Sequence, residues 1–415
     1  MFKNKTAWLF IFTAFVSGLC GSFFYPLSSL FIIEALGASP AMLSIYMVLS
    51  VCASVVVSQY IAIQSDKNWR RKTILLTALS CYLITVVSFS VIRDYYLAVT
   101  VAMVFGSVSG AIFGQLFALG REFADRHLED STSFLGIMRA GIAIAWVFGP
   151  PLAFMLKSAF GFSASFLVAG LVTALTIVIT LICIPGSTQN PAQTKSDGID
   201  DQQTAPTNTA LDTSESVQQR VLNKRIVIFS VAVVLMFAAS NLYITVMPLY
   251  LSQELMIGTQ WVGILFGLAA FCEIPIMMNA GKLAHRFGTL RVLNVGLISG
   301  CLFYIGMINL SDLGSFMALQ IFNGIFIGLT ATLGMVAMQD MMKHRLGTAS
   351  TLFSSLLQIS TLMASLSIGV VGELFSYFGA FYVSLTSVSM AFIILTYLIV
   401  SDRKAERNAI TSSAC

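Results

Sequence analysis

Long apolar stretches separated by short polar segments make up most of this chain. Twelve of them are long enough for a membrane-spanning helix, because the hydrocarbon core of a bilayer is about 30 Å thick and a helix rises about 1.5 Å per residue. We expect these helices at approximately residues 7–33, 41–63, 74–92, 96–120, 133–156, 162–184, 226–251, 260–280, 291–310, 315–338, 350–372 and 379–400. The pattern predicts an all-α, multi-pass membrane protein.

The composition supports this prediction. Of the 415 residues, 57% are hydrophobic and 10% are charged, whereas soluble proteins carry about 25% charged residues. Polar side chains are too few to cover a soluble body, which excludes a soluble enzyme and a nucleic-acid-binding protein. The three histidines and seven cysteines show no spacing typical of a metal site, so we expect no bound metal.

The distribution of basic residues predicts the orientation in the membrane. With the N-terminus in the cytoplasm and the loops alternating in side, 20 of the 23 Lys and Arg residues fall on the cytoplasmic side. Only Arg93 and Lys157 fall on the outer side, and Arg139 falls within a helix. Because positive charge is retained on the cytoplasmic side of membrane proteins, we expect both termini in the cytoplasm.

A polar segment at 185–224 separates six expected helices from the next six. Its Gln, Thr, Ser, Asp and Pro residues cannot bury a core, so we expect a disordered cytoplasmic linker. The linker joins a six-helix bundle at 1–184 to a second bundle at 225–400, which a cytoplasmic tail follows at 401–415.

The two halves contain matching positions at nearly one offset. Pro26 in the first helix corresponds to Pro248 in the seventh, and Gly149 in the fifth helix corresponds to Gly369 in the eleventh. Such matches indicate an internal duplication. Two facing bundles of this kind enclose a cavity near the midplane and alternate its access between the two sides of the membrane.

Two short charged loops occupy corresponding places in the halves. The first, at 62–71, resembles G-x-L-a-D-R-x-G-R-R, a signature of the major facilitator superfamily, and the second, at 281–291, keeps the glycines. A charged turn of this kind can dock on the other half and release it, which implies a conformational latch. Topology-determining positive charge is the alternative interpretation. The candidate latch residues are Asp66, Lys67, Arg70, Arg71, Gly281 and Arg286.

Several segments resemble the sugar efflux transporters of the same superfamily. They are Gln115–Asp125, Met138–Ala140, Ala145–Met155, Asn241–Tyr243, Met247–Leu249, Glu273–Pro275 and Leu319–Asn323. The resemblance implies the major facilitator fold, with two pseudo-symmetric six-helix bundles. It also implies export of small saccharides across a bacterial inner membrane in exchange for protons.

We expect a monomer in the lipid bilayer that needs no cofactor besides the proton gradient. Drug export and sugar uptake on the same fold are alternative functions. A membrane enzyme would need an acid–base or metal set near the membrane that the sequence does not contain, so we expect no catalytic activity.

Polar and aromatic residues at membrane depth are candidates for the substrate site, because a polar group there must face a partner or a water-filled cavity. Amides offer both donors and acceptors to sugar hydroxyls, and aromatic faces suit the C–H faces of sugar rings. The alternative is interhelical hydrogen bonding and packing. The candidates are Asn241, Gln320, Asn323, Gln358, Trp146, Tyr25 and Tyr243.

Two charges remain inside the expected helices, Arg139 in the fifth and Glu273 in the eighth. They lie at similar depth, and helices 5 and 8 pack together in the superfamily that the chain resembles. We therefore expect an ion pair that breaks when Glu273 takes up a proton, which would couple protonation to movement of the halves. Glu122 and Asp125 are competing partners for Arg139, and snorkelling of Arg139 is the alternative.

Overall fold

The computed structural model describes residues 5–67, 69–128, 131–183, 212–342 and 345–413. In these ranges the chain forms helices and no strand. In the N-terminal half the helices are α1 (Lys5–Leu30), η1 (Phe31–Ala35), α2 (Pro40–Lys67), α3 (Arg71–Val91), α4 (Tyr95–Val101), η2 (Ala102–Gly106), α5 (Ser107–Ser109), α6 (Ile112–His127) and α7 (Ser131–Cys183). In the C-terminal half they are α8 (Asp212–Leu249), η3 (Tyr250–Glu254), α9 (Gln260–Phe287), α10 (Thr289–Asn309), α11 (Leu313–Met341), α12 (Leu346–Leu374) and α13 (Gly379–Ser413).

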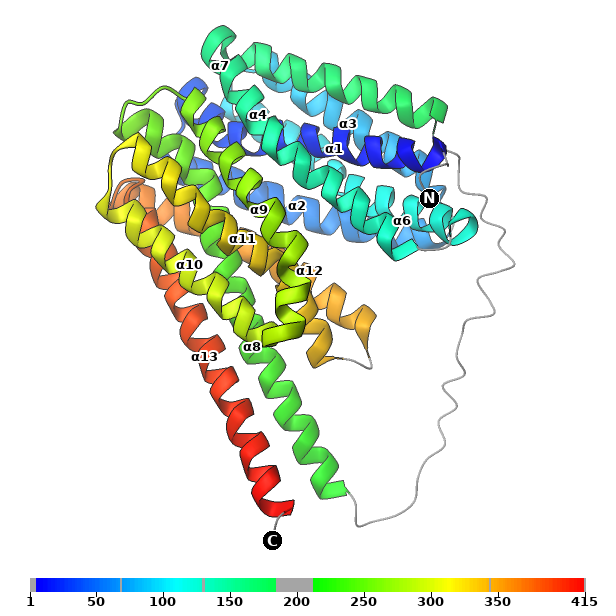
Figure 1. The fold of residues 1–415 in the computed structure, drawn as a ribbon. Coiled ribbons are helices and arrows are strands. Elements are labelled where there is room, and N and C mark those ends of the chain that lie inside the picture. The colour runs from blue at the N-terminus through cyan, green and yellow to red at the C-terminus, as the bar shows by residue number, and fades with distance from the viewer. Residues whose placement is uncertain (1–4, 68, 129–130, 184–211, 343–344, 414–415) are drawn as a thin grey trace.

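The described residues include eleven helical segments that are long and apolar enough to cross a membrane. One of them, Phe134–Ile182, has 49 residues and is interrupted at Gly161, where φ is 81° and ψ is 176°. Figure 1 shows that α7 turns back on itself, and Ser165 Oγ donates a hydrogen bond of 2.8 Å to the carbonyl oxygen of Ala153 across this turn. Counted as two helices, α7 brings the number of crossings to the predicted twelve.

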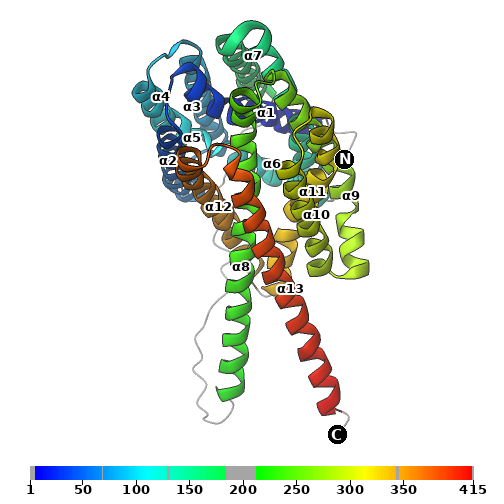
Figure 2. The ribbon, with the colours of Figure 1, turned by 90° about the vertical axis from the view of Figure 1, so that its left-hand side faces the viewer.

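Helices extend further than expected at two places. The linker was predicted at 185–224. Its residues 185–211 lie outside the described part of the chain, and its last thirteen residues belong to α8, which begins at Asp212. Residues 212–224 contain neither Pro nor Gly, so the helix can continue out of the membrane. Likewise, α13 runs to Ser413, so the expected tail is largely helical. Figure 2 shows α8 and α13 projecting beyond the other helices.

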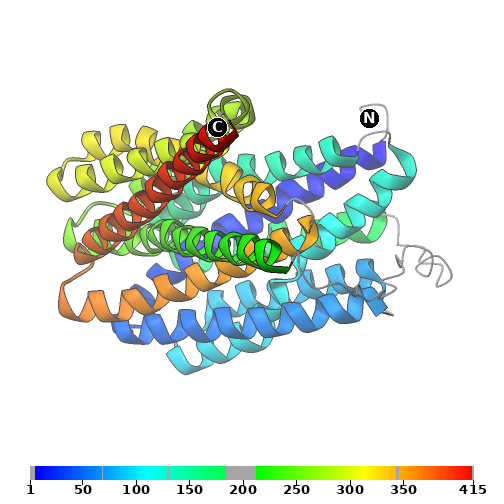
Figure 3. The same cartoon turned by 90° about the horizontal axis from the view of Figure 1, so that it is seen from below.

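The two halves meet at one end and diverge at the other. Figure 1 shows the helices of the N-terminal half, blue to teal, and those of the C-terminal half, green to red, converging at the upper left. They separate toward the opposite end, where both termini lie. Across the halves α7 packs against α9, and α2 packs against α12. Figure 3 shows the second pair side by side, as blue and orange helices.

Corresponding helices of the two halves share an unusual local geometry. The first helix of each half contains a proline, Pro26 in α1 and Pro248 in α8, and each helix continues into a π-helical turn. The two turns, η1 and η3, begin at Phe31 and Tyr250, five and two positions after the respective proline. Proline removes one helical hydrogen bond. A proline followed by a π-helical turn is therefore common to the first helix of each half, with a register that differs by three residues.

Candidate functional site

A cavity of about 230 Å³ lies between the two halves. Its wall is formed by α7 of the N-terminal half and by α8, α9 and α11 of the C-terminal half. The lining residues are Ala143, Trp146, Ser240, Tyr243, Ile244, Phe266, Ala269, Ala270, Glu273, Asn323 and Ile327. Four of the residues that the sequence analysis selected from separate helices, Trp146, Tyr243, Glu273 and Asn323, thus meet in one wall.

Gln320 lies behind this wall and fixes two of its members. Its side chain is fully buried, and its Oε1 accepts hydrogen bonds from Tyr243 Oη at 3.3 Å and from Asn323 Nδ2 at 3.0 Å. Its Nε2 donates to the carbonyl oxygen of Phe316 at 3.0 Å, which fixes the orientation of the amide. Gln320 was expected to bind substrate, and that role stays a prediction. In this conformation it does not line the cavity but bonds to Tyr243 and Asn323, which do.

The orientation of Asn323 leaves polar groups available to a ligand. Its Nδ2 donates to Gln320, and its Oδ1 has no hydrogen-bond partner in the described part of the chain. An amide held in this way presents an acceptor and a second N–H donor. Trp146 on α7 adds an indole ring to the same cavity from the other half of the molecule.

The acidic residue in the wall, Glu273, forms no ion pair among the described residues. The expected partner, Arg139, is exposed, and its guanidinium lies 5.6 Å from the centre of the Phe117 ring on α6. The expected Arg139–Glu273 pair is therefore not formed in this conformation. Arg139 precedes the cavity residue Ala143 by four positions, so it lies about one helical turn from the cavity, toward the end with the termini.

The competing partners of Arg139 are engaged elsewhere. Glu122 Oε1 lies 2.7 Å from Nε of Arg71 at the start of α3, and Asp125 lies 3.8 Å from Arg121. Glu122 therefore connects α6 to α3 within the N-terminal half, and it makes no contact with the cavity in this conformation.

Three further candidates lie outside the cavity wall. Asn241 Nδ2 donates to Ser360 Oγ at 3.3 Å and to Thr361 Oγ1 at 3.2 Å, so it joins α8 to α12. The Tyr25 side chain lies near that of Thr245, across the two halves. Gln358 is half-buried on α12.

Hydrogen bonds close the end of the molecule that faces away from the termini. Ser158 Oγ donates to Gln260 Oε1 at 3.0 Å, and Ser44 Oγ donates to the carbonyl oxygen of Ser365 at 2.6 Å. The backbone N–H of Ala41 donates to Glu373 Oε1 at 3.3 Å, so a carboxylate of α12 caps the start of α2. We call the end of the molecule that these contacts hold together the closed end.

Small residues allow α9 and α7 to approach closely there. A Cβ atom at Gly263 would lie 2.7 Å from the carbonyl oxygen of Pro150, and one at Gly267 would lie 2.7 Å from that of Val147. The two prolines of α7, Pro150 and Pro151, and the glycines of α9 therefore form a surface that separates the cavity from this side.

The candidate latch loops lie at the opposite end. Arg70, Gly281 and Arg286 are exposed, Arg286 lies 5.1 Å from the centre of the neighbouring Phe287 ring, and Arg71 pairs with Glu122 of its own half. The side chains of Asp66 and Lys67 lie outside those that the structure describes. The role of these residues as a latch stays a prediction.

Comparison with known proteins identifies the family. Residues 10–224 and 229–414 match the Major Facilitator Superfamily. The chain belongs to the major facilitator superfamily. Sugar efflux transporter A of Dickeya chrysanthemi is 32% identical to it over 395 residues, which cover 94% of each chain. Sugar efflux transporter C of Escherichia coli (strain K12) is 30% identical over 396 residues, 95% of this chain and 96% of the other. Within the superfamily, the chain is a member of the sugar efflux transporter family.

Solved structures of the superfamily confirm the fold. The nucleoside transporter NupG superposes with a TM-score of 0.73 over 95% of this chain and 99% of its own, at 14% identity. The peptide transporter POT in complex with sulfate has a TM-score of 0.73 over 97% of this chain and 95% of its own, at 12% identity. The predicted major facilitator fold is thus correct.

Sequence reasoning missed several members of the cavity wall. Phe266, Ala269 and Ala270 precede Glu273 by seven, four and three positions, and Ser240 precedes Tyr243 by three. Residues at these spacings share one face of a helix. These residues could have been found by counting three, four and seven positions back from each polar candidate. Small and apolar residues are too common in a membrane helix to indicate a site by themselves.

Proposed function

We propose that this protein exports small saccharides or their analogues from the bacterial cytoplasm by alternating access. The observation that carries the proposal is the cavity wall, in which the aromatic residues Trp146 and Tyr243 occur together with the Asn323 amide. A sugar presents hydroxyl groups along its edge and C–H groups on its faces, so it matches this combination of groups. The sugar efflux transporters that the chain resembles along nearly its whole length support the same substrate class.

The cavity favours a small substrate. Its volume of about 230 Å³ is below the range of about 300–1,000 Å³ that is typical of sites for drug-sized ligands. The wall is mostly apolar, but its amide and carboxylate supply polar groups for sugar hydroxyls. Export of amphipathic drugs is the second candidate, because Phe266, Ile244 and Ile327 line the cavity as well.

Proton exchange drives the export in this proposal, and Glu273 is the group that takes up the proton. It is the only acidic residue among the described residues that line the cavity, and it has no basic partner in this conformation. Arg139 stands about one turn away on the facing helix, so a small movement of α7 relative to α9 can bring the two together. Protonation of Glu273 would then release the pair and favour the conformation without it.

The orientation is part of the proposal. We place both termini in the cytoplasm of the inner membrane, in agreement with the distribution of Lys and Arg. The closed end then faces outward, and the conformation is one that loads substrate from the cytoplasm. A single chain encloses the whole cavity, so we propose that a monomer is sufficient.

Retention of a labelled, non-metabolised galactoside in bacterial cells tests the proposal. Cells that produce the protein should retain less label than cells with an empty vector, and Asn323→Ala should restore retention at equal protein level. Asn294→Ala is the matched control, because this half-buried amide bonds Thr396 in another part of the C-terminal half. Unchanged retention of the galactoside, together with lowered retention of a cationic dye, would contradict sugar export and favour drug export.

A further inference from the structure

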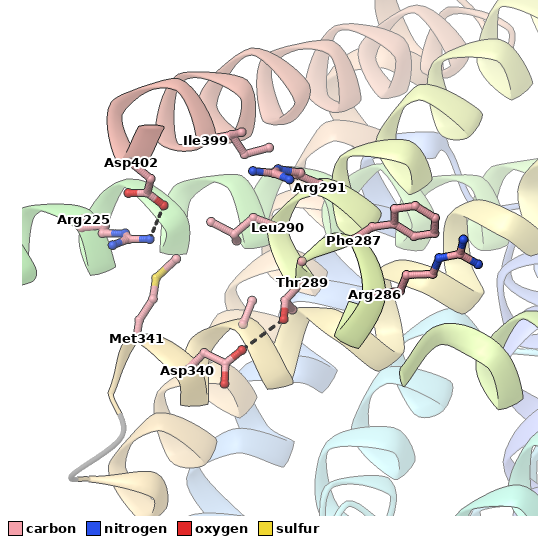
Figure 4. A pocket seen from close by; sticks show the side chains of 12 residues that line it. Arg225, Arg286, Phe287, Thr289, Leu290, Arg291, Asp340, Met341, Ile399 and Asp402 are labelled. Carbon is pink, nitrogen blue, oxygen red and sulfur yellow. Dashed lines mark hydrogen bonds and ion pairs between the residues drawn. The ribbon is translucent and has the colours of Figure 1, made fainter. Parts of the chain in front are cut away.

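A second cavity, of about 530 Å³, opens at the end of the C-terminal half where α13 leaves the bundle. It lies between the C-terminal ends of α9 and α11, the first turn of α10, and the sides of α8 and α13. Figure 4 shows the side chains that line it. It shares no lining residue with the central cavity. Its charged members are three arginines and two aspartates: Arg225, Arg286, Arg291, Asp340 and Asp402.

Most of these charges already have partners. Arg225 Nη2 lies 2.5 Å from Asp402 Oδ2, and Asp340 Oδ2 accepts a hydrogen bond of 3.1 Å from Thr289 Oγ1. Each of the three arginines has donors left over. Arg291 and Arg286 form no ion pair or hydrogen bond among the described residues, although Arg286 lies over the Phe287 ring, and the buried Nε of Arg225 has no acceptor there. Figure 4 places the side chains of Arg225 and Arg291 on the side of Ile399 and Asp402.

The corresponding position in the N-terminal half is neutralised. Arg71 at the start of α3 corresponds to Arg291 in α10, and Glu122 near the end of α6 corresponds to Asp340 near the end of α11. Arg71 and Glu122 form an ion pair of 2.7 Å. In the C-terminal half Asp340 bonds to Thr289 instead, which leaves the guanidinium of Arg291 available to an anion.

The start of α10 adds further donors to the same place. Thr289, Leu290 and Arg291 line the cavity and form the first turn of this helix. The turn contains no acidic residue, and no side chain caps it. The first N–H groups of a helix lack intrahelical partners and carry the positive end of the helix dipole. Backbone and side-chain donors therefore line the same cavity.

We propose that this cavity binds a phosphate group. Arginine offers a planar fork of donors that matches phosphate oxygens, and a helix N-terminus supplies further N–H groups to them. The phosphate can belong to the headgroup of an anionic lipid, since basic pockets between membrane helices bind such headgroups, or to a soluble phosphomonoester. The site lies apart from the central cavity, so the proposal does not depend on the identity of the transported substrate.

Binding to the purified, delipidated full-length chain tests the proposal in two arms. Native mass spectrometry measures binding of phosphatidylglycerol against phosphatidylcholine, and thermal unfolding measures stabilisation by glycerol 1-phosphate against glycerol. Arg291→Gln should raise the apparent Kd at least tenfold in the arm that shows binding. Lys282→Gln is the matched control, because Lys282 is exposed near the end of α9, outside the cavity, and its loss changes the net charge equally. It should change the Kd less than twofold.

The two arms also identify the source of the phosphate. Binding of phosphatidylglycerol alone would assign the site to lipid, and binding of glycerol 1-phosphate would assign it to a soluble ligand. Arg291→Lys keeps the charge but loses the fork, so it should weaken binding by an intermediate factor even if Arg291→Gln folds poorly. Equal weakening by Arg291→Gln and Lys282→Gln would overturn the proposal, as would the absence of phosphate-dependent binding to the wild type in both arms.

Discussion

Gly263 of α9 lies directly against the backbone of Pro150 in α7, so that a Cβ atom at Gly263 would stand 2.7 Å from the Pro150 carbonyl oxygen. This contact joins the two halves at the closed end. Because the atoms on the α7 side belong to the backbone, they cannot move aside as a flexible side chain would. The stability of the closed end therefore depends on the absence of a side chain at this position.

Gly263→Ala should open the closed end. We expect a longer distance between spin labels at Tyr96 and Ser311, which are exposed on the two halves at this end, as measured by pulsed electron–electron double resonance. Gly114→Ala is the control, since a Cβ there meets nothing within 4 Å. It should leave the distance unchanged and stabilise its helix by about 0.5–1 kcal/mol. The same distance distribution in both variants would show that the clash is absorbed locally.

Gln320→Leu should weaken substrate binding although Gln320 does not line the cavity. The variant removes the acceptor of Tyr243 Oη and Asn323 Nδ2, and an unpaired buried donor costs about 1–3 kcal/mol. Both side chains should lose their fixed orientation, so we expect KM for the galactoside to rise about tenfold with a smaller change in kcat. Asn294→Leu removes an amide outside the site and should leave KM unchanged. An equal fall in kcat for both variants, at constant KM, would indicate a purely structural role.

Glu273→Gln should separate transport from the proton gradient. The amide keeps the size of the carboxyl group but cannot exchange a proton, so export against a gradient should stop while exchange of substrate down its own gradient continues. The assay is galactoside flux into inverted membrane vesicles, with and without an imposed pH difference. Asp94→Asn is the control, because Asn also caps a helix and α4 should be unaffected. Full, pH-sensitive export by Glu273→Gln would exclude this residue as the coupling group.

Cross-linking of Ser158→Cys to Gln260→Cys should arrest transport. The two native side chains hydrogen-bond across the closed end at 3.0 Å, so a short bis-maleimide can join the two thiols only while that end is closed. Flux should fall nearly to the background of vesicles without the protein, because alternating access requires both ends to open in turn. The variants with only one of the two substitutions, treated in the same way, control for reaction of the native cysteines. Undiminished flux at complete cross-linking would mean that this end does not open during transport.

Hydropathy alone predicted nearly the whole architecture, because a membrane-spanning helix needs a continuous apolar run that nothing else in the sequence imitates. Trp146, Tyr243, Glu273 and Asn323 were also found from sequence, since polar and aromatic groups at membrane depth are rare enough to be informative. The start of α8 was missed because residues 212–224 are polar and yet compatible with a helix.

Sequence could not give the contacts between side chains. Gln320 and Asn323 looked equivalent in the sequence, and only the direction of their side chains shows that one supports the other. The expected Arg139–Glu273 pair is not formed in this conformation, where Arg139 lies over the Phe117 ring instead. Helical spacing places a residue on a face of its helix, but it does not fix the distance between faces of different helices.

The π-helical turns after Pro26 and Pro248 have a consequence for the history of the molecule. A local irregularity that recurs near the end of the first helix of both halves was either acquired twice or inherited once by both copies, and common inheritance needs fewer events. The ancestor, a chain of six helices, then already carried this irregular turn. Glu273 and the Gln320 network, by contrast, belong to the C-terminal half alone, so the two copies contribute unequally to the central cavity.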